Sequence, residues 1–174
     1  MRKYILICFI GIWMQCSTTS VFAKQPSHYA IQANIIYHFT KYIDWPESKK
    51  TGDFTIGIVG ETPLYNELSK LVSGKKVGNQ KIVIKRFSSS SAAFNCHILF
   101  ISDDETNSVK RISTNTNGSS VLLVSESEGL ARRGSCINFS IVDERMKLEI
   151  NKNNIQERNL SVANELLKLA ILIK

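Results

Sequence analysis

The stretch that decides the fold spans residues 134–151 and reads GSCINFSIVDERMKLEIN. Apolar and polar residues alternate on both sides of Asp143 and Glu144. Successive side chains of a strand point to opposite faces, so this alternation predicts two antiparallel strands joined at the acidic pair, a β-hairpin. One predicted face is apolar throughout, with Ile137, Phe139, Ile141, Met146, Leu148 and Ile150.

The opposite face of the second strand carries a polar row, formed by Arg145, Lys147, Glu149 and Asn151. Such a row is usually the solvated face of a half-buried sheet. Charged and amide groups at fixed spacing also suit docking of a partner protein. Both interpretations stay open, and the row is the first candidate for partner binding.

Upstream of the hairpin, strand and helix patterns alternate along the chain. Short apolar runs at residues 54–60, 81–87, 96–102 and 121–125 are typical of buried, parallel strands. Helical spacing or capping residues mark the segments between or before them. The sequence therefore predicts a single α/β domain, with a central, mostly parallel sheet, flanking helices and a C-terminal β-hairpin.

A last helix is expected after the hairpin, capped by Ser161 and docked on the sheet. Its apolar residues cover most of its circumference, so burial should make it a major contributor to the core, at about 1.5–3 kcal/mol for each large aliphatic side chain. These residues are Val162, Ala163, Leu166, Leu167, Leu169, Ala170 and Ile171.

The N-terminus has the pattern of a secretory signal peptide over residues 1–23. Arg2 and Lys3 precede an apolar run that is too short for a membrane span, and cleavage is expected after Ala23. An uncleaved anchor and a lipoprotein attached through Cys16 are less favoured alternatives. We therefore expect residues 24–174 to form the exported, periplasmic domain.

The exported domain is mildly basic. The whole chain has a formal net charge of +7, and removal of Arg2 and Lys3 with the signal peptide, which has no acidic residue, leaves +5. Lys and Arg are scattered among acids and form no stripe interleaved with aromatics, so a nucleic-acid partner is not expected. Attraction to an anionic membrane surface fits this charge better.

Two cysteines remain after the signal peptide, Cys96 and Cys136, in a compartment where a disulfide can persist. Each precedes a predicted strand. If those strands are parallel neighbours, a Cys96–Cys136 disulfide is expected and would stabilise the fold by about 4 kcal/mol in the chain-entropy model. If another strand lies between them, the bond cannot form.

Trp45 is the second candidate for partner binding. The proline at position 46 ends the first predicted helix and keeps Trp45 out of helical geometry, so a large aromatic lies at a corner of the chain. A residue at the edge of the core and a partner contact are both open interpretations.

The motifs of common enzymes are missing from the sequence. Gly57 and Gly60 do not complete a dinucleotide-binding fingerprint, and His28, His38 and His97 have no spacing that suggests a catalytic triad or a zinc site. His97 opens a strand, where a hydrogen-bonded structural imidazole is expected. The sequence therefore predicts a protein without enzymatic activity, cofactor or metal.

The chain resembles the YfiR family through a series of short motifs in matching order, which covers essentially all of residues 24–174. They are Tyr29-Ala30, residues 39–46 (FTKYIDWP), 56–60 (IGIVG), 96–101 (CHILFI), 134–139 (GSCINF), 149–151 (EIN) and 166–170 (LLKLA). The resemblance implies a periplasmic α/β protein that binds the periplasmic part of an inner-membrane diguanylate cyclase and holds it inactive. Release under envelope or redox stress is also implied. Disulfides matter in the best-known members, whereas the exported part of this chain has two cysteines, and Cys136 lies where the family more often has methionine or another residue.

Two functional hypotheses follow. In the first, the protein is a regulator in cyclic-di-GMP signalling or a related pathway, and docks on an inner-membrane sensor, either a diguanylate cyclase or a histidine kinase. In the second, it is a periplasmic small-ligand-binding module that holds a polar ligand at helix N-termini such as residues 61–63 or 103–104. The sequence leaves a homodimer open in both cases.

Overall fold

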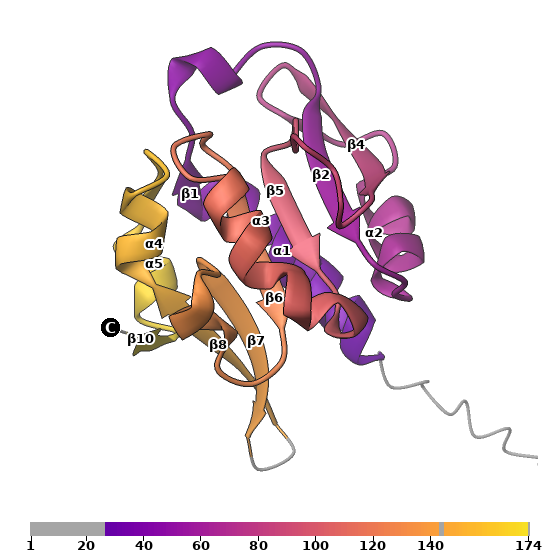
Figure 1. The fold of residues 1–174 in the computed structure, drawn as a ribbon. Helices are drawn as coiled ribbons and strands as arrows, with labels where there is room; N and C mark the ends of the chain where they lie inside the picture. Colours follow the sequence, from indigo (N-terminus) through magenta and orange to yellow (C-terminus); the bar gives the residue numbers. More distant parts are fainter. Residues whose placement is uncertain (1–26, 143–144, 174) are drawn as a thin grey trace, which may run out of the picture.

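The structure, a computed structural model, describes residues 27–142 and 145–173 (Figure 1). The predicted signal peptide, Cys16, the cleavage site after Ala23 and the hairpin turn at residues 143–144 lie outside the described residues. The described chain forms a single α/β domain around an eight-stranded, mostly parallel sheet, as the sequence predicts. Its strands, from one edge to the other, are β10 (Ile171–Ile173), β8 (Arg145–Asn151), β7 (Ile137–Val142), β6 (Leu122–Glu126), β5 (Ile98–Ile101), β2 (Phe54–Val59), β4 (Gln80–Phe87) and β3 (Lys76–Val77).

The middle of the sheet is parallel, and antiparallel pairs occur toward its two edges. Strands β4, β2, β5, β6 and β7 run parallel to one another, whereas β3 is antiparallel to β4. The predicted hairpin is confirmed: β7 and β8 are antiparallel, with Ile137 opposite Ile150 and Val142 opposite Arg145. Strand β10 adds to the outer edge of β8 in parallel.

Helices cover both faces of the sheet. Figure 1 shows α3 (Val109–Asn115) in front of the sheet and α1 (His28–Tyr42) behind it, where α1 packs against α2 (Leu64–Val72). Helix α1 begins at a serine cap, because Ser27 Oγ accepts the N–H of Ala30 at 3.2 Å. The remaining helical segments are η1 (Glu47–Lys49), η2 (Asp103–Ser108), η3 (Leu130–Arg133), α4 (Lys152–Gln156) and α5 (Asn164–Leu167).

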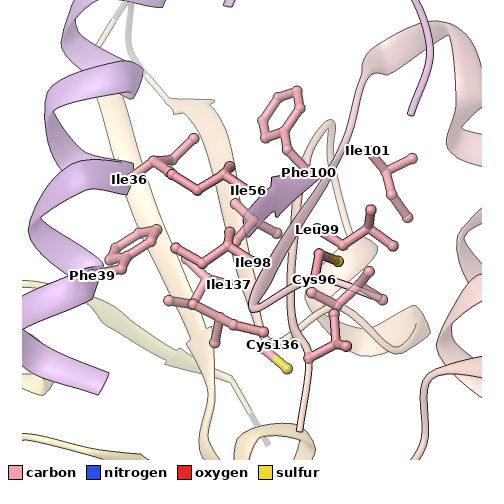
Figure 2. Close-up of a cluster of buried hydrophobic side chains, with 14 of the residues drawn as sticks. Ile36, Phe39, Ile56, Cys96, Ile98, Leu99, Phe100, Ile101, Cys136 and Ile137 are labelled. Carbon is pink, nitrogen blue, oxygen red and sulfur yellow. The ribbon is translucent and has the colours of Figure 1, made fainter. Parts of the chain in front are cut away.

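The core lies between α1 and the centre of the sheet. Ile36 and Phe39 of α1 face Ile98 and Ile137, and all four side chains are fully buried (Figure 2). At Gly57 in β2, an added Cβ would lie 2.8 Å from both Leu99 Cδ1 and the Phe87 ring, so a side chain there would displace its neighbours. The continuous apolar runs therefore correspond to strands that are covered on both faces.

The C-terminal segment differs from the long helix that the sequence predicts. Ser161 and Val162 form β9 (Ser161–Val162), which pairs with β1 (Ile43–Asp44) in a small second sheet. Only one turn of helix, α5, follows, and it docks on the core through Leu166, whereas Leu169 is 78% exposed. Strand pairing engages the backbone groups that a longer helix would need, so tertiary structure overrides the helical pattern here.

Candidate functional site

Trp45 is a core residue and not an exposed anchor. Its side chain is 5% exposed, and its indole Nε1 donates a hydrogen bond to the carbonyl of His97 at 3.3 Å. The ring meets Phe54 edge-on, with centroids 5.1 Å apart. This burial corrects the expectation of a partner contact at Trp45, because the fold turns the indole inward at the corner before the proline.

His97 is a structural imidazole, as expected for a histidine that opens a strand. Its Nδ1 accepts the N–H of Thr55 at 3.1 Å, so the proton is on Nε2, which donates to the carbonyl of Lys49 at 2.7 Å. Burial lowers the pKa of His97 below its ordinary value. The neutral His97 ring therefore hydrogen-bonds through both nitrogens and links the start of β2 to the turn at η1.

The polar row of the hairpin is not one solvated surface. Arg145 is exposed, Lys147 and Glu149 are half-buried, and Asn151 is buried. Asn151 caps α4, since its Oδ1 accepts the N–H of Asn154 at 3.2 Å, and its Nδ2 donates to the carbonyl of Ala131 at 3.0 Å. Asn151 is thus a structural residue, and the first three members of the row remain accessible.

Glu149 belongs to a polar network at the base of the hairpin. The Nδ2 group of Asn138 donates to Glu149 Oε2 and to the carbonyl of Ser127, both at 2.9 Å. Asn138 Oδ1 accepts the hydroxyl of Ser125 at 2.8 Å. Asn138 is fully buried, so the sheet is polar inside at the place where the alternating pattern predicts a solvated face.

The crevice in which open α/β sheets usually bind ligands is filled by the chain itself. Such crevices lie at the carboxyl ends of strands where the strand order reverses, here between β2 and β5. The Ser102 hydroxyl hydrogen-bonds Asp104, whose other oxygen accepts the N–H of Glu61 at 3.1 Å. These hydrogen bonds lower the pKa of Asp104, and the one from Ser102 has the largest effect.

The hollow that remains at this crevice has a volume of about 280 Å³. This is below the roughly 300–1,000 Å³ of typical ligand pockets. Glu61 and Arg86, which line it, form an ion pair of 2.9 Å, Nη1 to Oε1. The helix ends at residues 61–63 and 103–104 therefore offer a small ligand little room at this crevice.

A larger groove lies beside the hairpin, between the start of α1, the end of β6 and the two hairpin strands. Its volume is about 740 Å³. Four carboxylates line it, and we call it the acidic groove after them: Asp103, Glu126, Glu128 and Glu149. Its apolar wall includes Tyr29, Phe139 and Met146.

Glu126 is the half-buried carboxylate of the acidic groove. Its Oε2 accepts the amide Nε2 of Gln32 at 3.0 Å, and its Oε1 accepts the N–H of Asp103 at 3.4 Å. Burial is the main cause that raises the pKa of Glu126, and the nearby carboxylates Asp103 and Asp104 add to it. The site therefore holds an anion whose partners are neutral groups.

A second, apolar groove of about 530 Å³ lies next to the acidic groove, between α1, β8 and the C-terminal segment. Ile31 and Ile35 of α1, with Leu166, Leu169 and Ile171, form most of its walls, and we call it the apolar groove. The two grooves share the side chains of Phe139 and Met146, so they form one continuous surface.

Comparison with known proteins identifies the family of the chain. The model of the YfiR/HmsC-like family matches residues 29–171. The chain belongs to this family. The match confirms the resemblance read from the motifs, and the family is periplasmic and known for the regulation of signalling proteins. No curated protein matches the chain.

A solved structure agrees with the fold of this YfiR/HmsC-like protein. A crystal structure of a conserved domain protein from Vibrio cholerae O1 biovar El Tor is similar, with a TM-score of 0.61 and 11% sequence identity over 85% of this chain. The chain spans 60% of the length of that protein, and at this identity the likeness concerns the fold alone. Within the described residues, no helix has both the length and the hydrophobicity of a membrane span.

Cys96 and Cys136, the two cysteines that follow the predicted signal peptide of this YfiR/HmsC-like chain, are buried free thiols, so the Cys96–Cys136 disulfide is not formed in the structure. Strand β6 lies between the strands that follow them, which puts the two backbones about two strand spacings, or roughly 9.6 Å, apart. Disulfides need Cα atoms within about 7 Å. Burial raises the pKa of Cys96 to about 12 and also raises that of Cys136.

The grooves contain residues that the sequence pattern did not single out. Gln32 lies on the polar flank of the first predicted helix but is 5% exposed, and its amide donates to Glu126 at the end of β6. Ser140 is on the supposedly solvated face of β7 and is 6% exposed. An acid directly after a buried strand, as at Glu126, was the available signal for this site.

Proposed function

We propose that this protein is a non-enzymatic periplasmic regulator that binds the periplasmic part of an inner-membrane signalling protein and represses it. A diguanylate cyclase is the partner that the family resemblance favours. The observation that carries the proposal is the exposed apolar surface along the apolar groove and the hairpin end. This surface, with the regulatory role of the family, supports a protein partner.

The exposed apolar residues gather on one part of the molecule. Each exposed large hydrophobic residue in the described ranges belongs to α1, the end of β7 or the C-terminal segment: Ile31, Ile141, Val142, Leu169, Ile171 and Leu172. Single exposed apolar residues are normal, but contiguous ones mark interaction sites. Leu169 and Leu172, at 78% and 58% exposure, are the strongest candidates for central contacts.

The backbone of β10 adds a second feature that favours docking. Strand β10 pairs with β8 on one side and is the last strand of the sheet on the other. Edge strands carry backbone N–H and C=O groups without a ladder partner, onto which an extended segment of another protein can add. Apolar side chains from Ile171 and Leu172 would flank such a segment.

The charged residues of the hairpin belong to the rim of the proposed interface. Arg145 is exposed and Lys147 half-buried, and Lys147 also lines the apolar groove. Rim charges mainly affect association rate and specificity, whereas buried apolar anchors contribute most of the affinity. We therefore expect substitutions at Leu169 to weaken partner binding more than substitutions at Arg145.

A matched pair of variants tests the proposal. Leu169→Asp alters the apolar groove, and Lys81→Ser alters an exposed residue of β4 near the other edge of the sheet, with the same change of net charge. Each variant is co-expressed with the cognate membrane protein, and co-purification and cyclase activity in membranes are measured. We expect Leu169→Asp to weaken binding by about tenfold or more and to relieve repression.

Equal binding and equal repression by both variants and the parent would place the docking surface elsewhere. A melting curve of each variant checks that loss of binding does not come from unfolding. Measuring kinase autophosphorylation beside cyclic-di-GMP synthesis decides between a histidine kinase and a diguanylate cyclase as the repressed partner.

A further inference from the structure

The strand register divides the acidic groove between the two faces of the sheet. Glu126 of β6 lies opposite Phe139 of β7, and the Phe139 ring stacks on Phe39 of α1 with centroids 6.4 Å apart. Glu149 of β8 lies opposite Asn138, which alternates with Phe139 along β7 and therefore points to the other face. Glu126 is thus the carboxylate on the α1 face of the groove, and Glu149 is on the opposite face.

Gln32 of α1 contacts Glu126 and has one polar atom without a partner. Its Nε2 donates to Glu126 Oε2 at 3.0 Å, whereas its Oε1 has no hydrogen-bond partner among the described residues. The Gln32 side chain lines the groove and is 5% exposed. A buried acceptor without a donor is costly, so Gln32 Oε1 indicates a donor that the chain itself does not supply.

The negative charge of Glu126 is also without a counter-charge. No Lys or Arg of the described chain lines the groove, and Glu126 takes part in no salt bridge within the described ranges. A carboxylate can accept about four hydrogen bonds, and the donors to Glu126 are the neutral amide of Gln32 and the N–H of Asp103. A cationic donor would supply both the missing charge and the missing hydrogen bonds.

The α1 face continues from Glu126 into the apolar groove. Phe139 and Met146 line both grooves, and Met146 is on the same face as Phe139 because it lies opposite Ile141. Leu148 of the apolar groove lies opposite Phe139, so two strand spacings, roughly 9.6 Å, separate Leu148 from Glu126. About three residues of an extended segment cover this distance. A single segment can therefore contact the carboxylate and the apolar groove together.

Helix α1 forms the second wall of this surface. Gln32 lines the acidic groove, and Ile31, Ile35 and His38 line the apolar groove. Residues three or four positions apart are neighbours on a helix surface, so one stripe of α1 borders both grooves. The surface thus follows α1 on one side and the hairpin on the other, with the acid at one end and apolar residues at the other.

We propose that the docking segment of the membrane partner inserts an arginine at Glu126 and places apolar residues, about three positions away in its sequence, in the apolar groove. The guanidinium donates to the Glu126 carboxylate and to Gln32 Oε1. Its five N–H donors lie in one plane and it is weakly hydrated, which suits two adjacent acceptors beside Phe139 and Met146 better than an ammonium group does. This inference rests on the proposed function, because the partner supplies the arginine.

Co-purification with the cognate membrane protein tests the charge at this site. Glu126→Gln keeps an acceptor for Gln32 and Asp103 but removes the charge, so we expect partner binding to weaken by about tenfold or more. The matched control is Glu67→Gln, which removes the same charge from α2, where Glu67 pairs with Lys70 at 3.7 Å. The affinity of this control should stay within about twofold of the parent, because exposed ion pairs contribute little. Melting curves check that both variants are folded.

A double-mutant cycle identifies the arginine in the partner. Each Arg and Lys in the periplasmic part of the partner is replaced by Gln, and its binding is measured with the parent protein and with the Glu126→Gln variant. One arginine should be coupled to Glu126. Its replacement should weaken binding of the parent by about tenfold or more, and binding of Glu126→Gln by less than about twofold. A merely structural effect of Glu126→Gln would not produce this coupling.

A titration without the partner gives an independent readout. The probes are N-acetyl-arginine amide and N-acetyl-citrulline amide, which have nearly the same shape, but the citrulline probe has no charge. In nuclear magnetic resonance spectra of the exported protein, the Gln32 side-chain amide and the backbone amides of residues 126–128 should shift with the arginine probe. The citrulline probe should leave these signals unchanged.

Three results would overturn the arginine site. They are equal partner binding by Glu126→Gln and Glu67→Gln, the absence of coupling between Glu126 and any arginine of the partner, and equal signal shifts with the two probes. The outcomes also separate this inference from the proposed function. If Leu169→Asp weakens partner binding and Glu126→Gln does not, the arginine site is wrong and the apolar docking surface stands. If neither variant weakens it, both proposals are wrong.

Discussion

The two halves of the sheet use their apolar residues differently. In the parallel half, formed by β2, β4, β5 and β6, all four residues of β5 are fully buried. In the C-terminal half, formed by β7, β8 and β10, Ile171 and Leu172 are 45% and 58% exposed. Apolar runs are thus buried where helices cover both faces of the sheet. Where helices do not cover it, similar residues are exposed. The exposed half contains the surface that we propose as the partner-binding site.

The largest expected effect comes from the same substitution made in each half. Leu99→Ala in β5 removes a fully buried side chain, and Leu169→Ala removes one that is 78% exposed. We expect Leu99→Ala to lower the free energy of unfolding by about 2–5 kcal/mol, through lost burial and a cavity. Leu169→Ala should change it by less than about 0.5 kcal/mol. Urea denaturation of both variants measures the difference.

A similar loss of stability in both variants would contradict the division into a core half and a surface half. The Leu169→Ala protein should also keep its circular dichroism spectrum, because α5 docks on the core through Leu166.

The next prediction divides the hairpin row within the C-terminal half. Asn151→Ala removes the cap of α4 and leaves the carbonyl of Ala131 with one donor fewer, so we expect a loss of about 1–3 kcal/mol in unfolding free energy. Lys147→Ala removes a half-buried side chain that makes no hydrogen bond or salt bridge within the described residues, so it should cost less than about 0.5 kcal/mol. Thermal and urea unfolding of the two variants measure these changes. If they are equally stable, Asn151 is not the structural member of the row.

Much of the fold could be predicted from the sequence, because its signals are local. The apolar runs at residues 54–60 and 96–102 and the alternation around residues 143–144 specify strands through the backbone period. The C-terminal helix could not be predicted correctly, since the pairing of Ser161 with Asp44 and of Ile171 with Glu149 joins residues far apart in the chain. Local pattern contains no information on such pairing.

The candidate site was harder to predict for the same reason. Trp45 and Asn151 are polar or aromatic residues at corners, and only the packing around them shows that both are buried. The acidic groove joins Gln32, Glu126 and Glu149 from three separate elements. The family motifs contained Glu149 and Asn151 but could not separate the accessible residue from the structural one.

A smaller effect on stability is expected from pH, through His97 at the start of β5. Burial lowers the pKa of His97 in the folded protein, so the unfolded chain binds a proton first as pH falls below about 6.5. Folding stability should therefore be level above that pH and fall by up to about 1.4 kcal/mol per pH unit below it, until the folded imidazole also protonates. Urea denaturation between pH 5 and pH 8 measures this slope.

The variant His97→Gln tests whether that imidazole is the cause. Glutamine keeps a donor and an acceptor but does not titrate, so its stability profile should lack the His97 contribution. His38, which is exposed on α1, provides the matched control through His38→Gln. If both variants keep the slope of the parent, the pH dependence comes from groups other than the His97 imidazole.

The smallest effect on stability is expected from reductant. This test concerns Cys96 in the parallel half and Cys136 in the C-terminal half. Cys96 precedes β5 and Cys136 precedes β7, and with β6 between those strands the two backbones are about 9.6 Å apart across the sheet, too far for a disulfide. Without that crosslink, reductant should leave the melting temperature unchanged, whereas loss of a disulfide would cost about 4 kcal/mol in the chain-entropy model.

In thiol titration at pH 8, the folded protein should react very slowly, because burial raises the pKa of Cys96 to about 12 and also raises that of Cys136. The unreduced protein should show both thiols after denaturation, and a finding of none would mean that the two halves are crosslinked and that β6 does not separate them.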